Sequence, residues 1–199
     1  MFRYLRSCSF LLSLLLFAPS LSNAADMAGK YALRGAGLTK CQVFLEAYAA
    51  KGPKAHVFYG WIDGYISGLN ELSPNTYDRA PWQSTELLAE VVRRACTQAP
   101  NQYFFAELRS VVAAMNEQRM SVGQDKKVLE MGENRAIVYP DTVERAQRAL
   151  QALGHYAGEV NGAFDPATHQ AIIKFQTAKG IPVTGLPGPI TLWALFIEG

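Results

Sequence analysis

The sequence predicts an all-α protein made of two small domains, a disulfide-stapled four-helix domain and a domain of three short helices. Three observations predict this fold class. Apolar residues recur at three- and four-residue spacing in several segments. Two cysteines remain once an N-terminal leader is set aside. A proline followed two residues later by threonine occurs three times near the C-terminus, at Pro140, Pro166 and Pro189.

Residues 1–24 have the pattern of a secretory signal peptide. Arg3 and Arg6 form a basic start, the apolar stretch 10–17 follows, and small residues around Ala24 offer a cleavage site. The apolar stretch is shorter than the roughly 20 residues needed to span a bilayer. Cys8 precedes it and so does not fit a lipoprotein signal. We expect an exported protein without a membrane span.

The charge balance argues against nucleic acid or an anionic membrane surface as the partner. The chain has 19 Lys+Arg and 17 Asp+Glu, and the leader holds two of the basic residues and no acidic one. The remainder therefore balances at 17 − 17 = 0. No basic patch of the kind that binds phosphates is predicted.

Residues 25–120 are predicted to form the helical domain with a Cys41–Cys96 disulfide. An even pair of cysteines in an exported protein favours a bridge. A redox or zinc site is the alternative, but no CxxC is present and the histidines are scattered. Closing this loop should stabilise the fold by about 4 kcal/mol in the chain-entropy description. Apolar spacing places the helices at about 38–50, 55–71, 84–98 and 102–117.

This segment also resembles a family of small secreted helical proteins. The series Cys41, Trp61-Ile62-x-Gly64-Tyr65-x-x-Gly68-x-Asn70, Cys96-x-x-x-Pro100 carries the resemblance. It is similar to periplasmic acid-stress chaperones and to secretion-system immunity proteins. The resemblance implies a fold more than an activity.

Residues 121–139 are polar and are predicted to be an interdomain linker. The stretch 136–139 within it is expected to form a short strand or to pack onto the C-terminal domain. The domain of residues 140–199 follows.

An internal repeat organises this last domain. Six residues recur at a spacing of 23: Val160, Gly162, Pro166, Thr168, Ala171 and Ile172 match Val183, Gly185, Pro189, Thr191, Ala194 and Leu195. Proline suits the first turn of a helix, where its missing N–H costs nothing. Asp165 and Gly188 stand at the two N-cap positions. The repeat predicts short helices that begin at matching turns.

An ordered series of residues extends from about 141 to 196. It runs Val143-x-x-x-Gln147-x-x-Leu150-x-x-Leu153-Gly154-x-Tyr156-x-Gly158-x-Val160-Asn161-Gly162-x-Phe164, then Thr168, Ala171-Ile172-x-x-Phe175-Gln176, Gly180-Ile181, Thr184-Gly185 and Thr191-Leu192-x-x-Leu195. This series resembles the three-helix peptidoglycan-binding domain of bacterial envelope proteins. The resemblance implies peptidoglycan as the ligand and a location at the cell wall.

The candidate ligand contacts are the polar and aromatic residues near the turns of this domain. Sugar recognition needs an aromatic face with converging hydrogen-bond partners. The residues that offer these groups are His155, Tyr156, Asn161, Asp165, Thr168 and Gln176. The alternative is that they serve turns and caps inside the domain.

No catalytic set, metal site or cofactor motif is predicted. The three histidines lack zinc-ligand spacing, and both remaining cysteines are assigned to the bridge. The sequence leaves open one catalytic possibility, the pair of carboxylates that a muramidase needs. The candidates for such a pair are Glu46, Glu71, Glu86, Glu90 and Glu107.

We therefore expect a non-catalytic, exported peptidoglycan-binding protein that localises the helical domain at the wall, in the periplasm or secreted. A periplasmic protein is a second expected partner, contacted through the helical domain. The alternatives are a wall-remodelling hydrolase with an unrecognised active site and a wall-tethered immunity or chaperone protein.

Overall fold

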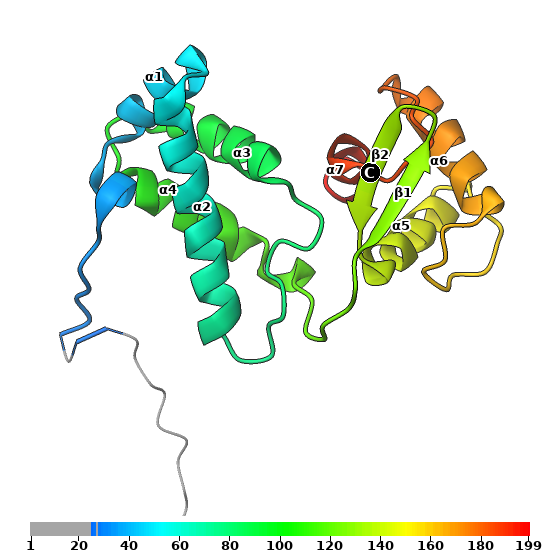
Figure 1. Ribbon diagram of the computed structural model, residues 1–199, viewed down its shortest axis with the longest axis horizontal. Coiled ribbons are helices and arrows are strands. Elements are labelled where there is room, and N and C mark those ends of the chain that lie inside the picture. Colours follow the sequence, from blue (N-terminus) through cyan, green and yellow to red (C-terminus); the bar gives the residue numbers. More distant parts are fainter. Residues whose placement is uncertain (1–24, 27) are drawn as a thin grey trace, which may run out of the picture. The chain divides into compact units, whose positions relative to one another are not determined.

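The computed structural model describes residues 25–26 and 28–199 (Figure 1). The leader predicted for residues 1–24 lies outside the described residues. Two units result, one ending at Leu33 and one comprising Arg34–Gly199. In the first, the carboxylate of Asp26 accepts hydrogen bonds from the backbone N–H groups of Ala28 and Lys30, at 2.9 and 2.8 Å.

The first part of the second unit is helical, as predicted. Its elements are a 3₁₀ turn η1 (Gly35–Leu38), α1 (Cys41–Ala50), α2 (Pro53–Leu72), α3 (Thr85–Gln98), α4 (Phe104–Ala114) and a 3₁₀ turn η2 (Asn116–Gln118). The four helices predicted from apolar spacing are confirmed. The first begins later than expected because residues 35–38 form the separate 3₁₀ turn.

Aromatic rings fill the core between these helices. Phe44, Phe58 and Phe104 come from three different helices, and their ring centroids lie 4.9 to 5.1 Å apart. Rings at this separation in tilted and edge-on geometry add to the stabilisation from burial. Each of the three is at most 4% exposed.

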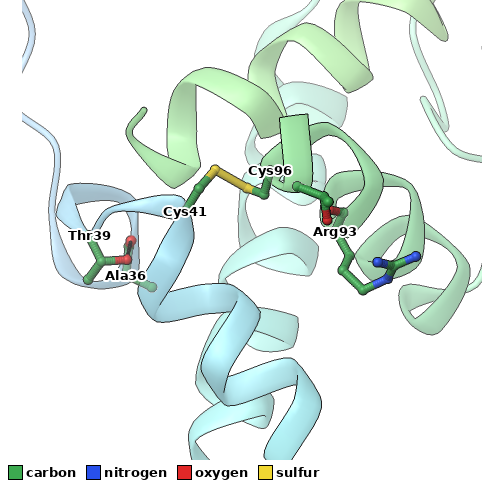
Figure 2. The surroundings of a disulfide bond; sticks show 6 residues. Ala36, Thr39, Cys41, Arg93 and Cys96 are labelled. Carbon is green, nitrogen blue, oxygen red and sulfur yellow. Dashed lines mark hydrogen bonds between the residues drawn. A yellow bond between two sulfur atoms is a disulfide. The ribbon is translucent and has the colours of Figure 1, made fainter. Parts of the chain in front are cut away.

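The predicted disulfide is present and joins the first residue of α1 to α3 (Figure 2). Cys41 and Cys96 are fully buried, and their Cα atoms are 5.1 Å apart. Backbone hydrogen bonds hold the start of α4 beside the bridge: Cys41 N–H donates to Gln102 C=O, and Phe104 N–H donates to Thr39 C=O, both at 2.9 Å. The bridge and these hydrogen bonds together hold the ends of three helices near one point.

The stretch predicted as a linker contains an antiparallel hairpin. Strand β1 (Lys127–Met131) pairs with β2 (Asn134–Val138), with Leu129 opposite Ala136. Ala136 and Val138 are buried and pack with Val143 and Leu186. The fold is thus mainly helical but carries a two-stranded sheet that the sequence analysis did not predict as a hairpin.

Three helices complete the chain: α5 (Pro140–Ala152), α6 (Pro166–Lys179) and α7 (Pro189–Phe196). Each begins with proline in its first turn, as the repeated pattern predicted. Their shared core is formed by buried apolar side chains, among them Ala146, Leu150, Ile172, Phe175, Leu192 and Leu195.

One aromatic side chain from the helical part belongs to this second core. Trp82 is 5% exposed, packs in the same cluster, and meets the ring of Phe196 edge-on at 5.5 Å. Its Nε1 donates to the side chain of Gln118 at 3.1 Å, and Arg145 donates to the Gln118 carbonyl at 2.9 Å. Residues 34–199 are accordingly one compact unit with three hydrophobic clusters.

Among the residues that the structure describes, no helix is both long enough and apolar enough to cross a membrane.

The disulfide makes a prediction for protein that begins at residue 25, which lacks Cys8. Reduction, or a Cys41→Ser and Cys96→Ser double substitution, should lower the melting temperature, because the unfolded chain regains the freedom of a loop worth about 4 kcal/mol. Thermal unfolding with and without reductant measures the effect. Labelling of both thiols by a maleimide in the native, non-reduced protein would contradict the bridge.

Candidate functional site

A buried glutamine on α5 holds the turn that leads into α6. The Gln147 side chain is fully buried. Its Oε1 accepts hydrogen bonds from the backbone N–H groups of Asn161 and Gly162 at 3.0 and 2.9 Å. Its Nε2 donates to the Thr168 hydroxyl and to the Ala163 carbonyl, both at 2.9 Å. One amide thereby fixes both the turn and the first part of the next helix.

The same arrangement recurs one helix later. Gln176 is also fully buried, and its Oε1 accepts from the Gly185 N–H at 2.9 Å. Its Nε2 donates to the Thr191 hydroxyl at 2.8 Å and to the Leu186 carbonyl at 3.2 Å. The repeat in the sequence is therefore a repeated clamp, in which glutamine joins a glycine turn to the threonine of the following helix.

The third proline–threonine pair lacks such a clamp. Thr142 lies at the matching position of α5 and is fully buried. Its hydroxyl has no hydrogen-bond partner among the described residues. The segment that precedes α5 is the hairpin and not a glutamine-bearing helix, so only two of the three turns are held in this way.

The clamps explain why glycine occupies both turns. Gly162 and Gly185 have φ values of 75° and 69°, in the left-handed region that favours glycine. A Cβ at Gly162 would lie 2.7 Å from the Pro140 carbonyl oxygen, and one at Gly185 would lie 2.1 Å from the ring of His169. Any larger residue would push the turn away from its glutamine.

Three of the predicted ligand contacts are core residues. Thr168 and Gln176 are 0% exposed and Tyr156 is 5% exposed. The Tyr156 hydroxyl donates to the Glu159 carbonyl at 2.7 Å, inside the domain. Burial leaves these side chains no surface to offer to a ligand, so the alternative role in turns and caps is the one that the structure supports for them.

The other three predicted residues reach the surface of the domain. Asn161 is exposed, and its Oδ1 accepts from the Ala163 N–H at 2.9 Å. Asp165 caps α6 by accepting from the backbone N–H and the hydroxyl of Thr168, both at 2.7 Å. These hydrogen bonds from Thr168 hold the pKa of the Asp165 carboxyl below its usual range. His155 is half-buried, with its ring edge-on to Phe175.

The clamp brings most of the predicted residues together, although it does so below the surface. Gln147 contacts Tyr156, Asn161 and Thr168, and Thr168 connects the group to Asp165. His155 and Gln176 lie outside this group. Gln147 was quoted in the family motif but was not among the predicted contacts, and its hydrogen-bond partners are 9 to 21 residues away in the sequence.

A surface groove beside the hairpin was not predicted. It has a volume of about 400 Å³ and lies between β1 and the start of α6, with Met131, Phe164, Asp165 and His169 among its lining residues. The alternation of Leu129 and Met131 with polar residues, followed by Gly132, was the signal that could have revealed the strand.

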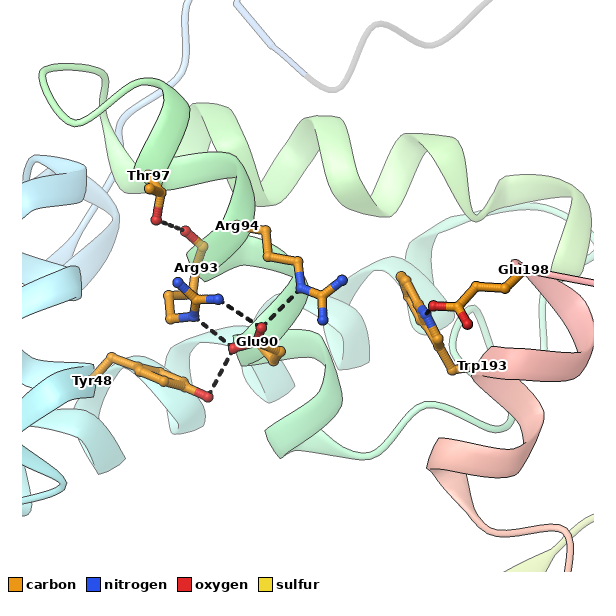
Figure 3. Close-up of polar contacts among 7 residues, drawn as sticks. All are labelled: Tyr48, Glu90, Arg93, Arg94, Thr97, Trp193 and Glu198. Carbon is orange, nitrogen blue, oxygen red and sulfur yellow. Dashed lines mark hydrogen bonds and ion pairs between the residues drawn. The ribbon is translucent and has the colours of Figure 1, made fainter. Parts of the chain in front are cut away.

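One candidate carboxylate, Glu90, lies in an arginine cluster in the helical part (Figure 3). It accepts from Arg93 at 2.6 and 2.8 Å, from Arg94 at 2.9 Å and from the Tyr48 hydroxyl at 3.1 Å. These hydrogen bonds, that from Arg93 first, lower the pKa of Glu90 to about 2. A glycosidase acid needs a raised pKa, so this glutamate is unsuited to that role.

Among the described residues, no group of three or more histidine, cysteine, aspartate or glutamate side chains could hold a metal ion.

The clamp predicts a large difference between two glutamines on α5. Gln147→Leu should lower the free energy of unfolding by about 3 kcal/mol or more. It leaves several buried polar groups without a hydrogen-bond partner, and each such group costs about 1–3 kcal/mol. Gln151→Leu, one turn later on the exposed side, should change it by less than about 0.5 kcal/mol. Chemical denaturation of both variants measures the difference, and equal losses would contradict the clamp.

The arginine cluster predicts a pH dependence of stability. The folded-state pKa of Glu90 lies at about 2, below its ordinary value of 4.5. Its contribution is therefore complete above pH 4.5 and is lost as the pH falls toward 2. The melting temperature of Glu90→Gln should fall less over this range than that of the unaltered protein. Parallel curves would show that the cluster does not stabilise the fold.

Comparison with known proteins gives a family match for the C-terminal region. Residues 140–195 match the family described as "Putative peptidoglycan binding domain". The chain is 41% identical over 61 residues to "N-acetylmuramoyl-L-alanine amidase CwlM" of Mycobacterium tuberculosis, covering 31% of this chain and 15% of that protein. It is 32% identical over 98 residues to "Putative OxPP cycle protein OpcA" of Synechococcus elongatus, covering 49% of this chain and 22% of that protein.

The chain thus spans less than a quarter of the length of either curated relative. No solved structure matches it. The family match starts at the first residue of α5 and ends within α7, and so takes in both glutamine clamps. The three-helix segment of residues 140–195 is a peptidoglycan-binding domain of this family.

Proposed function

We propose that this protein is exported and non-catalytic, and that it binds peptidoglycan through residues 140–199 and so localises its helical domain at the bacterial cell wall. The observation that carries the proposal is the family match across α5, α6 and α7. The buried disulfide supports it, because such bridges persist in oxidising compartments outside the cytoplasm. The periplasm or the secreted space is the proposed location.

The division into residues 25–120, 121–139 and 140–199 is part of this proposal. Each of the first and last segments has its own hydrophobic cluster. The hairpin between them packs on the C-terminal domain through Ala136 and Val138. The helical domain would then be the part that meets a periplasmic protein partner, while the C-terminal domain meets the wall.

The surface residues near the turns are the proposed ligand contacts within this domain. Asn161 and Asp165 reach the surface on either side of the first glycine turn, and His155 lies in the turn that follows α5. Each carries a group that can form hydrogen bonds with sugar hydroxyls or peptide groups. The clamps would hold these side chains in place before the ligand arrives, which reduces the entropy lost on binding.

A wall hydrolase is the alternative, and one relative is named as an amidase. That activity belongs to a protein of which this chain covers 15%, which is about the extent of a single binding domain. The lowered pKa of Glu90 argues against an acid catalyst at that position. The proposal therefore assigns wall binding and no hydrolysis to the chain.

The test is co-sedimentation of protein comprising residues 25–199 with purified, insoluble peptidoglycan. We expect binding at micromolar to millimolar affinity per site, about −8 to −4 kcal/mol, with retention increased by the many sites on one polymer. No soluble muropeptides should appear in the supernatant. Protein that stays in the supernatant at every salt concentration would overturn the assignment, and release of muropeptides would establish the hydrolase instead.

A matched pair of variants separates ligand contact from folding. Asn161→Asp keeps the oxygen that accepts from Ala163 but removes the amide donor, so it should weaken sedimentation without lowering the melting temperature. Phe175→Ala removes a fully buried ring and should destabilise the domain by about 3–5 kcal/mol. If Asn161→Asp binds as well as the unaltered protein, Asn161 is not a ligand contact.

A further inference from the structure

The groove beside the hairpin runs along the outer edge of one strand. In Figure 1, β1 lies on the α6 side of the hairpin and β2 on the other side. One wall of the groove is formed by consecutive residues of β1, from Val128 to Met131. The other wall is the start of α6, with Phe164, Asp165 and His169. We call this feature the hairpin groove.

The strand edge in this groove offers backbone hydrogen-bonding groups. Gly132 has a φ of 60° in a two-residue turn closed by Met131 and Asn134, which fits a type II′ hairpin. The residue pair that closes such a hairpin exchanges backbone hydrogen bonds, and from there hydrogen-bonded and non-hydrogen-bonded pairs alternate along the strands. The pairs that contain Val128 and Glu130 are non-hydrogen-bonded pairs. Val128 and Glu130 therefore direct their N–H and C=O groups outward. An unpaired edge of this kind is a template for an added strand.

The polar side chains along the groove are acceptors. Hydrogen bonds from Thr168 stabilise the charged form of the Asp165 carboxyl and hold its pKa below the usual range. Glu130 is exposed, and the ion pair that it forms with Arg135, at 3.8 Å, is open to solvent and weak. His169 Nδ1 lies 2.9 Å from the Gly185 carbonyl oxygen, which can only accept, so Nδ1 is the donor in this hydrogen bond. Such a groove suits a ligand that donates, above all a cation.

The dimensions and the remaining lining favour a short peptide over a sugar chain. Four residues of β1 extend over about 13 Å at the rise of an antiparallel strand, the length of three to four ligand residues. Sugars are recognised by exposed aromatic faces. The one aromatic ring in this groove besides His169 is Phe164, which is half-buried and packs in the domain core.

We propose that the hairpin groove binds a short peptide that carries a free amino group, namely the stem peptide of peptidoglycan with its diamino acid. The peptide lies against the outer edge of β1. One or two of its peptide groups are enough to form hydrogen bonds with the outward N–H and C=O groups of Val128 and Glu130. Its amino group lies between the carboxylates of Asp165 and Glu130. This inference rests on the proposed function and names the part of the polymer that is recognised.

The first experiment compares three forms of the ligand against protein comprising residues 25–199. These are intact peptidoglycan, glycan strands stripped of peptide by an amidase, and the soluble tripeptide N-acetyl-L-alanyl-γ-D-glutamyl-diamino acid with its side-chain amine free or acetylated. We expect sedimentation with intact peptidoglycan. The stripped glycan strands are soluble because their cross-links are gone, so their binding is measured by calorimetric titration, and we expect none. The tripeptide with a free side-chain amine should bind at least about tenfold tighter than the acetylated one.

The outcomes separate the two proposals. Binding of the stripped glycan strands overturns the peptide inference and leaves the wall-binding proposal standing. No sedimentation with intact peptidoglycan and no binding of the stripped glycan overturn the wall-binding proposal itself. Equal binding of the free and acetylated tripeptides removes the role assigned to Asp165 and Glu130.

The second experiment uses two proline substitutions at one cross-strand pair. Val128 and Ile137 face each other in the register and are 50% and 53% exposed. Both direct their N–H outward, but at opposite edges of the hairpin. Val128→Pro removes the donor in the groove and should weaken tripeptide binding about tenfold, since one hydrogen bond of this kind is at stake. Ile137→Pro should leave binding within about twofold. Equal effects of the two substitutions would overturn the strand-edge geometry.

A third variant keeps the proposal testable if proline disturbs the hairpin. Asp165→Asn retains an N-cap, because asparagine caps helices as well as aspartate, but it removes the charge. It should preserve the melting temperature and reduce the preference for the free amine over the acetylated form. An unchanged preference would contradict the placement of the amino group beside Asp165.

Discussion

The C-terminal domain depends on the burial of two side-chain amides. Gln147 and Gln176 are each 0% exposed and each accept from the N–H of a turn glycine. Burying an amide is costly unless it is paired, and here both ends of each amide are paired. The domain has only three short helices and a modest apolar core, so specific polar contacts decide where each turn lies. The clamps fix the positions of the turns relative to the helices and so give this small domain a defined framework.

That frame determines what can meet a ligand. The side chains that the clamps use, such as Thr168, cannot also bind the wall, because their polar groups are satisfied inside the domain. The surface that remains for a ligand is formed by the exposed residues around the first glycine turn and by the hairpin beside it. Asp165 belongs to both: it caps α6 through Thr168 and lines the hairpin groove. Its placement is therefore set by the fold and not by the ligand.

Sequence analysis predicted the helices and the bridge because both leave local signals. Apolar spacing is visible within a single helix, and the cysteine pair is clear once Cys8 is assigned to a leader. The ligand contacts were harder to predict. A buried Gln176 and an exposed glutamine look alike in a sequence, and the partners of Gln176 lie 8 to 15 residues away. The hairpin was overlooked because its exposed face is charged, at Glu130 and Arg135, and polarity suggested a linker.

Trp82 has a consequence for where the C-terminal domain begins. The family match starts at Pro140, but the core of that segment also contains this tryptophan, which lies 58 residues earlier in the chain and packs beside Phe196. The ring is only 5% exposed, so a chain trimmed to the matched residues would have a cavity where the indole packs. The segment that folds as one piece is therefore longer than the segment that the family model recognises.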